Sequence, residues 1–133
     1  MMTNATTPIL EVRGLSVRYG KVEVLYGAAI KVGAGQIVSV IGPNGAGKST
    51  LLNAIMGALP VTGHASGAIV YRGADVGMLP VEQRVARSMC LVQEKRELFG
   101  TMSVEDNLVL GVNRRGRPIS STSSITCSRC SRA

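Results

Sequence analysis

Aromatic side chains are scarce in this sequence, which contains three tyrosines, one phenylalanine and no tryptophan in 133 residues. Aliphatic residues must therefore fill any hydrophobic core. They are numerous enough to do so, because 45% of the residues are hydrophobic, which argues for a packed protein rather than a disordered one. The length suits one domain or an incomplete one, and it is too short for two full domains.

Long apolar runs are missing as well. No stretch approaches the roughly 18 consecutive apolar residues of a membrane span. Residues 1–8 lack the basic start and the apolar run of a signal peptide. The three cysteines, Cys90, Cys127 and Cys130, form no disulfide framework. We therefore expect a cytosolic chain whose cysteines are free thiols.

Acidic residues are absent from the tail, residues 114–133. The net charge of +7 divides into +2 for residues 1–113, from ten Lys/Arg against eight Asp/Glu, and +5 for the tail. A nucleic-acid-binding tail is one interpretation, but six serines dilute its charge and no aromatic residue interleaves it. Cys127 and Cys130 form a C-x-x-C, yet a zinc site needs a second pair and a redox motif opens a helix. We expect a disordered tail that binds no nucleic acid.

Alternating apolar residues predict antiparallel β structure near the start of the chain. The apolar positions are Leu10, Val12, Leu15 and Val17. Their phase slips at Gly14, which indicates a β-bulge. A turn then leads into strands over 22–25 and 30–32. Residues 36–41 are apolar on nearly every position and rich in β-branched side chains, which is typical of a buried strand in a parallel sheet.

Four shorter elements are predicted downstream. Strands are expected over 66–71 and 89–92, and Pro80 suits the first helical position of a short charged helix that ends at residue 87. Ser103-x-x-Asp106 resembles a capping box and predicts a helix that begins there. The only histidine, His64, is expected in an exposed loop.

A glycine-rich loop follows the strand expected over 36–41. It consists of Gly42, Pro43, Asn44, Gly45, Ala46, Gly47, Lys48 and Ser49, which fits the P-loop pattern G-x-x-x-x-G-K-[ST]. Glycines allow successive backbone N–H groups to turn inward around anionic oxygens. Apolar residues at helical spacing over 48–56, with Gly57 as a C-cap, predict a helix whose positive end adds to this attraction. Lys48 is expected to reach the β and γ phosphates, Ser49 to ligate Mg²⁺, and Thr50 to offer a further hydroxyl.

The stretch from Leu10 to Val112 resembles the ATPase subunits of ABC transporters. Residues 42–50 match the phosphate-binding loop of that family almost letter for letter. The resemblance implies that Tyr19 stacks on the adenine of ATP, in the manner of base–aromatic stacking. It also implies that Gln93 reaches Mg²⁺ and couples the site to a transmembrane subunit. Residues 97–108, with the segment 79–87 upstream, look most like importers of branched-chain amino acids and related amides or urea. The ATPase never touches the solute, so the solute rests on analogy alone.

Several family elements have no counterpart in the sequence. No LSGGQ signature and no apolar strand ending in Asp-Glu, the Walker B site, can be found, and His64 precedes Gln93 and so cannot be the switch histidine. The resemblance therefore assigns no catalytic residue. Hydrolysis requires a base and a positioned water as well as a bound phosphate. A P-loop GTPase is disfavoured because no Asn-Lys-x-Asp motif is present.

The tail reads best as an out-of-frame product. Residues 119–133 can be encoded so that a shifted frame reads as an amphipathic helix similar to the family's own segment at this point. We therefore expect residues 1–113 to be the N-terminal part of an ABC ATPase nucleotide-binding domain, truncated at its C-terminus. The expected fold is α/β of the P-loop NTPase type, with a small antiparallel β region packed on an incomplete core.

The expected function is the binding of ATP and Mg²⁺ in an ABC importer for branched-chain amino acids. By family analogy its partners are permease subunits and a second ATPase subunit, at the cytoplasmic face of the plasma membrane. A non-hydrolysing nucleotide-binding remnant without a transport function is the alternative. The two differ in whether the missing motifs occur downstream in another frame of the coding DNA.

Overall fold

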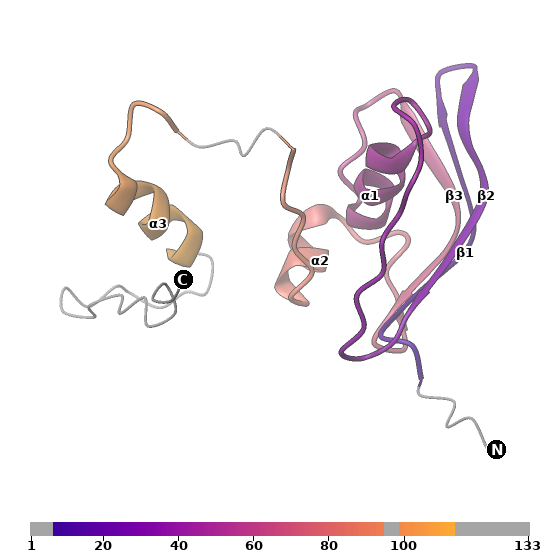
Figure 1. Cartoon of the computed structure of the whole chain (residues 1–133), viewed down its shortest axis with the longest axis horizontal. Coiled ribbons are helices and arrows are strands. Elements are labelled where there is room, and N and C mark those ends of the chain that lie inside the picture. Colours follow the sequence, from indigo (N-terminus) through magenta and orange to yellow (C-terminus); the bar gives the residue numbers. More distant parts are fainter. Residues whose placement is uncertain (1–6, 95–98, 114–133) are drawn as a thin grey trace. The chain divides into compact units, whose positions relative to one another are not determined.

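The computed structural model describes residues 7–94 and 99–113. The chain forms two compact units that divide between Val92 and Gln93. Among the described residues, the first unit contains a sheet with two helices, and the second contains one helix (Figure 1). The tail, with Cys127 and Cys130, lies outside the described residues.

The sheet of the first unit is antiparallel throughout, as expected for the start of the chain. Its strands are β1 (Leu10–Tyr19), β2 (Val22–Val32), β3 (Gly63–Tyr71) and β4 (Ala74–Asp75), in the order β2-β1-β3-β4. β2 is one continuous strand where the sequence suggested two. β3 begins earlier than the expected residue 66. His64 therefore lies in a strand, opposite Arg18, rather than in a loop, although its side chain is exposed as predicted.

The β-bulge predicted at Gly14 is confirmed. The pairing register shifts between Val12 and Leu15, and Gly14 has a φ of 57°. Across the bulge Gly67 approaches so closely that a Cβ there would lie 2.6 Å from the Gly14 carbonyl oxygen. The extra residue turns Leu15 to the same face as Val12, and both side chains are buried.

Helix α1 (Lys48–Met56) packs its apolar side against the sheet (Figure 1). The buried core consists of Val12, Leu15, Val17, Leu51, Ala54, Ile55, Met56, Ile69, Val76 and Met89. Gly57 ends the helix in the left-handed conformation, with a φ of 67°, and its N–H donates to the carbonyl oxygen of Ala54. The predicted C-cap is therefore confirmed.

Helix α2 (Val81–Ala86) is shorter than the expected segment and begins one residue later. Pro80 is the N-cap, with an extended ψ of 161°, and not the first helical residue. The carbonyl of Pro80 accepts from the N–H groups of Gln83 and Arg84, so proline still opens the helix.

Two expected strands are not formed. Residues 36–41 and 89–92 have no regular secondary structure, and Ile37 and Ile41 are 97% and 94% exposed. A strand is stable only when a neighbour pairs its backbone groups. No described residue pairs with either segment in a ladder, so their apolar sequences alone do not make them strands.

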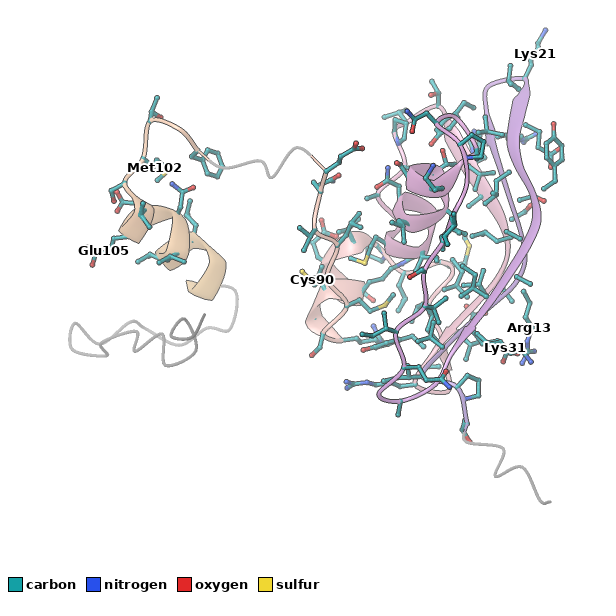
Figure 2. All side chains as sticks on the ribbon, in the orientation of Figure 1. Arg13, Lys21, Lys31, Cys90, Met102 and Glu105 are labelled. Atoms are coloured by element: carbon teal, nitrogen blue, oxygen red, sulfur yellow. The ribbon has the colours of Figure 1, made fainter. Side chains whose placement is uncertain are left out.

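An ion-pair cluster lies on the sheet, far along it from the β1–β2 turn. Glu11, whose side chain is 9% exposed, accepts from Arg13 and, at 2.9 Å, from Lys31. Figure 2 shows Arg13 and Lys31 side by side, with Lys21 at the opposite end of the sheet. Hydrogen bonds from these two bases lower the pKa of Glu11 from 4.5 to about 2.

The second unit contains α3 (Val104–Asn113) and the loop before it. The Oγ of Ser103 accepts from the Asp106 N–H at 3.1 Å and donates to the Asp106 carboxylate at 2.7 Å. The helix start predicted at Ser103 is therefore confirmed, with the serine hydroxyl as its cap. The second bond of a capping box differs, because the Asp106 carboxylate accepts from the Ser103 hydroxyl rather than from the Ser103 N–H. Of the helices that the structure describes, none combines the length and hydrophobicity needed to cross a membrane.

Candidate functional site

The glycine-rich loop connects the irregular segment 36–41 to α1. Its backbone turns back on itself where the N–H of Ala46 donates to the carbonyl oxygen of Pro43 at 3.2 Å. Gly45 and Gly47 both have a φ of 85°, a conformation that side chains disfavour. The two glycines are therefore required by the path of the loop.

The side chain of Lys48 folds over the start of the same loop. Its Nζ donates to the carbonyl oxygens of Gly42 at 2.8 Å and Pro43 at 2.7 Å. These bonds hold the ammonium group against the backbone of the loop's first two residues. One side chain therefore connects the beginning of the loop to the first residue of α1.

The N-terminus of α1 has the chemistry that an anion requires. Gly47 is the N-cap and provides no side-chain hydrogen bond, and the first turn has no acidic residue. No capping side chain therefore occupies the free N–H groups, and no carboxylate of the first turn offsets the positive end of the helix. Ser49 is exposed and Thr50 half-buried in the same turn, so hydroxyl oxygens stand beside these donors. This donor set fits a phosphate group with a hard cation such as Mg²⁺.

Strand β2 supports the loop from behind. A Cβ added to Gly47 would lie 3.4 Å from the carbonyl oxygen of Val24. Tyr19 pairs with Val22, so it stands across from the same end of β2. The tyrosine is half-buried, and its ring lies against Gly63, where an added Cβ would approach Cε1 to 3.0 Å. The topology thus brings Tyr19 and Gly47 to one half of β2.

Gln93 belongs to the second unit, whereas the loop belongs to the first. Its role at the site stays a prediction. Within residues 7–94 and 99–113, no cluster of three or more His, Cys, Asp or Glu side chains could hold a metal ion.

Arg84 is the residue that sequence reasoning missed. It lies in a segment read only as charged, yet it is 3% exposed and reaches the end of α1. Burial lowers the pKa of its guanidinium, and the Asp75 carboxylate opposes that shift. The available signal was spacing, because Val81, Arg84 and Val85 fall at i, i+3 and i+4 on one helix face.

Comparison with known proteins identifies the family. The family model described as ABC transporter matches residues 25–131, which include the loop, α1 and most of the tail. The chain belongs to the ABC transporter family. Members of this family have an ATPase domain, so membership implies ATP binding. The reading frame of the tail stays a prediction.

Two similar proteins are branched-chain amino acid transport ATP-binding proteins of Pseudomonas aeruginosa. BraG is 40% identical over 97 residues, which cover 73% of this chain and 40% of BraG. BraF is 36% identical over 107 residues, which cover 80% of this chain and 41% of BraF. The chain thus spans about two fifths of the length of these relatives. Import ATP-binding proteins named for ribose, zinc, phosphate, thiamine and hemin are also similar to it.

A solved structure supports the fold. A crystal structure of a nucleotide-free ATP-binding cassette from an ABC transporter superposes with a TM-score of 0.58 at 21% identity. The match covers 84% of this chain and 49% of that one. The fold is therefore that of the ABC ATPase cassette, as predicted. This chain corresponds to about half of the length of that cassette.

Proposed function

We propose that this chain binds Mg-ATP through residues 42–50, as the nucleotide-binding part of an ABC importer's ATPase subunit. The observation that carries the proposal is the position of Lys48. Its ammonium group lies on the loop backbone at the uncapped, acid-free N-terminus of α1. The ammonium group, the helix dipole and the free N–H groups of the first helical turn thus support one anion site.

Each residue of the loop has a proposed task. The glycines expose the backbone N–H groups that receive phosphate oxygens. Lys48 exchanges its carbonyl partners for the β and γ phosphates, and Ser49, with Thr50 beside it, supplies the hydroxyl ligand for Mg²⁺. Tyr19 stacks on adenine, and Gln93 is the proposed further ligand of Mg²⁺.

Magnitudes indicate that these parts act together. A helix terminus contributes about 0.3 to 2 kcal/mol toward an anion, whereas micromolar affinity requires about 8 kcal/mol. The ammonium of Lys48 and the backbone donors must therefore supply much of the difference. Loss of Lys48 also frees the loop's first two carbonyls from their only side-chain donor among the described residues.

Isothermal titration calorimetry tests the binding proposal. We expect the full chain to bind ATP in the presence of Mg²⁺, and Lys48→Ala to weaken the affinity at least about tenfold, or 1.4 kcal/mol. Lys31→Ala is the matched control, because it removes the same charge from β2 and leaves Glu11 its Arg13 partner. Equal affinity in the unchanged chain and Lys48→Ala would overturn the proposal.

The proposed solute is a branched-chain amino acid, and the proposed partners are permease subunits and a second ATPase subunit at the inner face of the plasma membrane. Support comes from the names of BraG and BraF, the first two relatives above. We expect the chain to bind detergent-solubilised permease subunits of a branched-chain amino acid importer more tightly than those of a ribose importer. Equal or reversed affinities, measured by surface plasmon resonance, would overturn the assignment of the solute.

The second candidate is a nucleotide-binding remnant without turnover. Such a remnant would lack the signature motif and the Walker B strand, neither of which occurs within these 133 residues. Both candidates require ATP binding, so calorimetry does not separate them. Sequencing the coding DNA downstream does, because the importer subunit requires both motifs in one of its frames.

A further inference from the structure

The end of α1 opposite the P-loop is held by a single buried side chain. The guanidinium of Arg84 donates to the carbonyl oxygens of Ala54 at 3.0 Å and Ile55 at 2.7 Å. These carbonyls belong to the last turn of α1, where a helix has no partners of its own. The N–H of Gly57 donates to the carbonyl oxygen of Ala54, and the N–H of Ala58 donates to that of Asn53. The carbonyl oxygen of Ile55 accepts from Arg84.

The same guanidinium is fixed from its other side. It donates to the carbonyl oxygens of Leu79 and Gly77, at 2.8 and 2.7 Å. Arg84 therefore joins three segments: the turn before α2, α2 itself and the C-terminal turn of α1. A planar group with five donors can bond several carbonyls at once, which an ammonium group cannot do with the same geometry.

The anchor matters because the chain before the other end of α1 has no regular secondary structure. Residues 36–43 are irregular and exposed, and the loop turns at glycines. Helix α1 is roughly 13 to 14 Å long, so a tilt of about 5° at its C-terminal turn would displace Lys48 by about 1 Å. Displacements of that size are enough to spoil alignment at a binding site.

We propose that Arg84 is a positioning residue for the nucleotide site: it clamps the C-terminal turn of α1 and thereby fixes Gly47 and Lys48 at the other end. The inference rests on the proposed binding of ATP. The cation also complements the negative end of the helix, while the anion is received at the positive end. The backbone carbonyl of Arg84 accepts from the Met89 N–H, so the clamp also holds the segment that leads to Gln93.

The test compares Arg84→Met and Arg84→Lys with a matched control on the same helix. Arg87→Met removes the same charge from the exposed C-cap residue of α2, whose guanidinium donates to the carbonyl oxygen of Gln83 at 3.3 Å. Affinity for Mg-ATP is measured by calorimetry on the full chain and normalised to the fitted stoichiometry, so that unfolded molecules do not count. We expect Arg84→Met to raise Kd at least fivefold, Arg84→Lys to raise it less, and Arg87→Met to leave it unchanged.

Hydrogen exchange without nucleotide gives a second readout. The N–H of Leu51 donates to the Gly47 carbonyl at 2.8 Å and reports on the first turn of α1. The N–H of Arg72 donates to Ile9 and reports on the sheet. We expect Arg84→Lys to accelerate exchange at Leu51 more than at Arg72. Equal acceleration at both amides would indicate general destabilisation and overturn the inference.

The outcomes separate the inference from the proposed function. If the unchanged chain does not bind ATP, the proposed function fails, and the inference fails with it. If the unchanged chain binds and both Arg84 variants have its Kd, only the inference fails. Should Arg84→Met not fold, Arg84→Lys decides the question by the same two measurements.

Discussion

Asn107 and Phe99 exchange two hydrogen bonds across the loop that precedes α3. The Phe99 N–H donates to Oδ1 of Asn107 at 3.0 Å, and Nδ2 of Asn107 donates back to the Phe99 carbonyl at 3.1 Å. The same Nδ2 also reaches the carbonyls of Met102 and Ser103. The side-chain amide of Asn107 thus pairs with the backbone of Phe99 as a second backbone segment would, and it connects the loop to the helix.

Replacing Asn107 should release this loop while leaving most of α3 in place. We expect Asn107→Ala to remove the protection of the Phe99 amide in hydrogen exchange, and Asn107→Asp to keep the acceptor but lose all donors. Each lost bond is worth about 0.5 to 1.5 kcal/mol. Ser103→Ala is the matched control, since it removes the helix cap without touching the Phe99 N–H. Unchanged protection of Phe99 in Asn107→Ala would contradict the prediction.

Stability should fall in acid through Glu11. Its folded-state pKa of about 2 lies below the ordinary 4.5, so the carboxylate stabilises the fold fully above about pH 4.5. That contribution is lost as the pH falls from 4.5 toward 2, where the folded state too takes up the proton. Thermal unfolding followed between pH 6 and 2.5 should show a smaller loss for Glu11→Gln than for the unchanged chain. Parallel curves would show that the ion pairs contribute nothing measurable.

Local signals were sufficient where neighbours in sequence decide the structure. The β-bulge at Gly14, the C-cap at Gly57 and the N-cap at Ser103 were all predictable from adjacent residues. The sequence of 36–41 indicated a strand, but strand formation depends on a partner that periodicity cannot supply. Arg84 was missed for a similar reason, since its carbonyl partners in α1 lie 29 and 30 positions earlier. The P-loop was predictable because glycine spacing itself dictates its path.

Exposed apolar residues should make the isolated chain prone to association. Ile37 and Ile41 are almost fully exposed, and Val61, Met78 and Val92 are at least 85% exposed. Such surface is costly in water and attracts other apolar surface. We expect light scattering to show aggregates at micromolar concentration, and Ile37→Lys with Ile41→Lys to reduce them. A monodisperse monomer with a sharp thermal transition would contradict this expectation.

ATP turnover by the chain alone should be undetectable even where binding is tight. The sequence contains the loop that orients phosphates but no signature motif and no Walker B carboxylate, and groups that position water change rates by orders of magnitude. Two copies would lack the same elements, so self-association cannot restore them. Phosphate release should equal that of Lys48→Ala, which controls for contaminating ATPases. Release above this background would contradict the prediction.

The extra residue at Gly14 gives β1 one position that it can lose without changing which side chains face the core. Val12 and Leu15 are three positions apart, yet both face the core because the bulge takes up one position between them. Deleting Gly14 would leave Val12, Leu15 and Val17 in plain alternation on the same face, whereas deleting Ser16 would turn the side chains on one side of it to the opposite face. A deletion scan of this strand should therefore find its greatest tolerance at Gly14. In β1 the place of a deletion matters as much as its size.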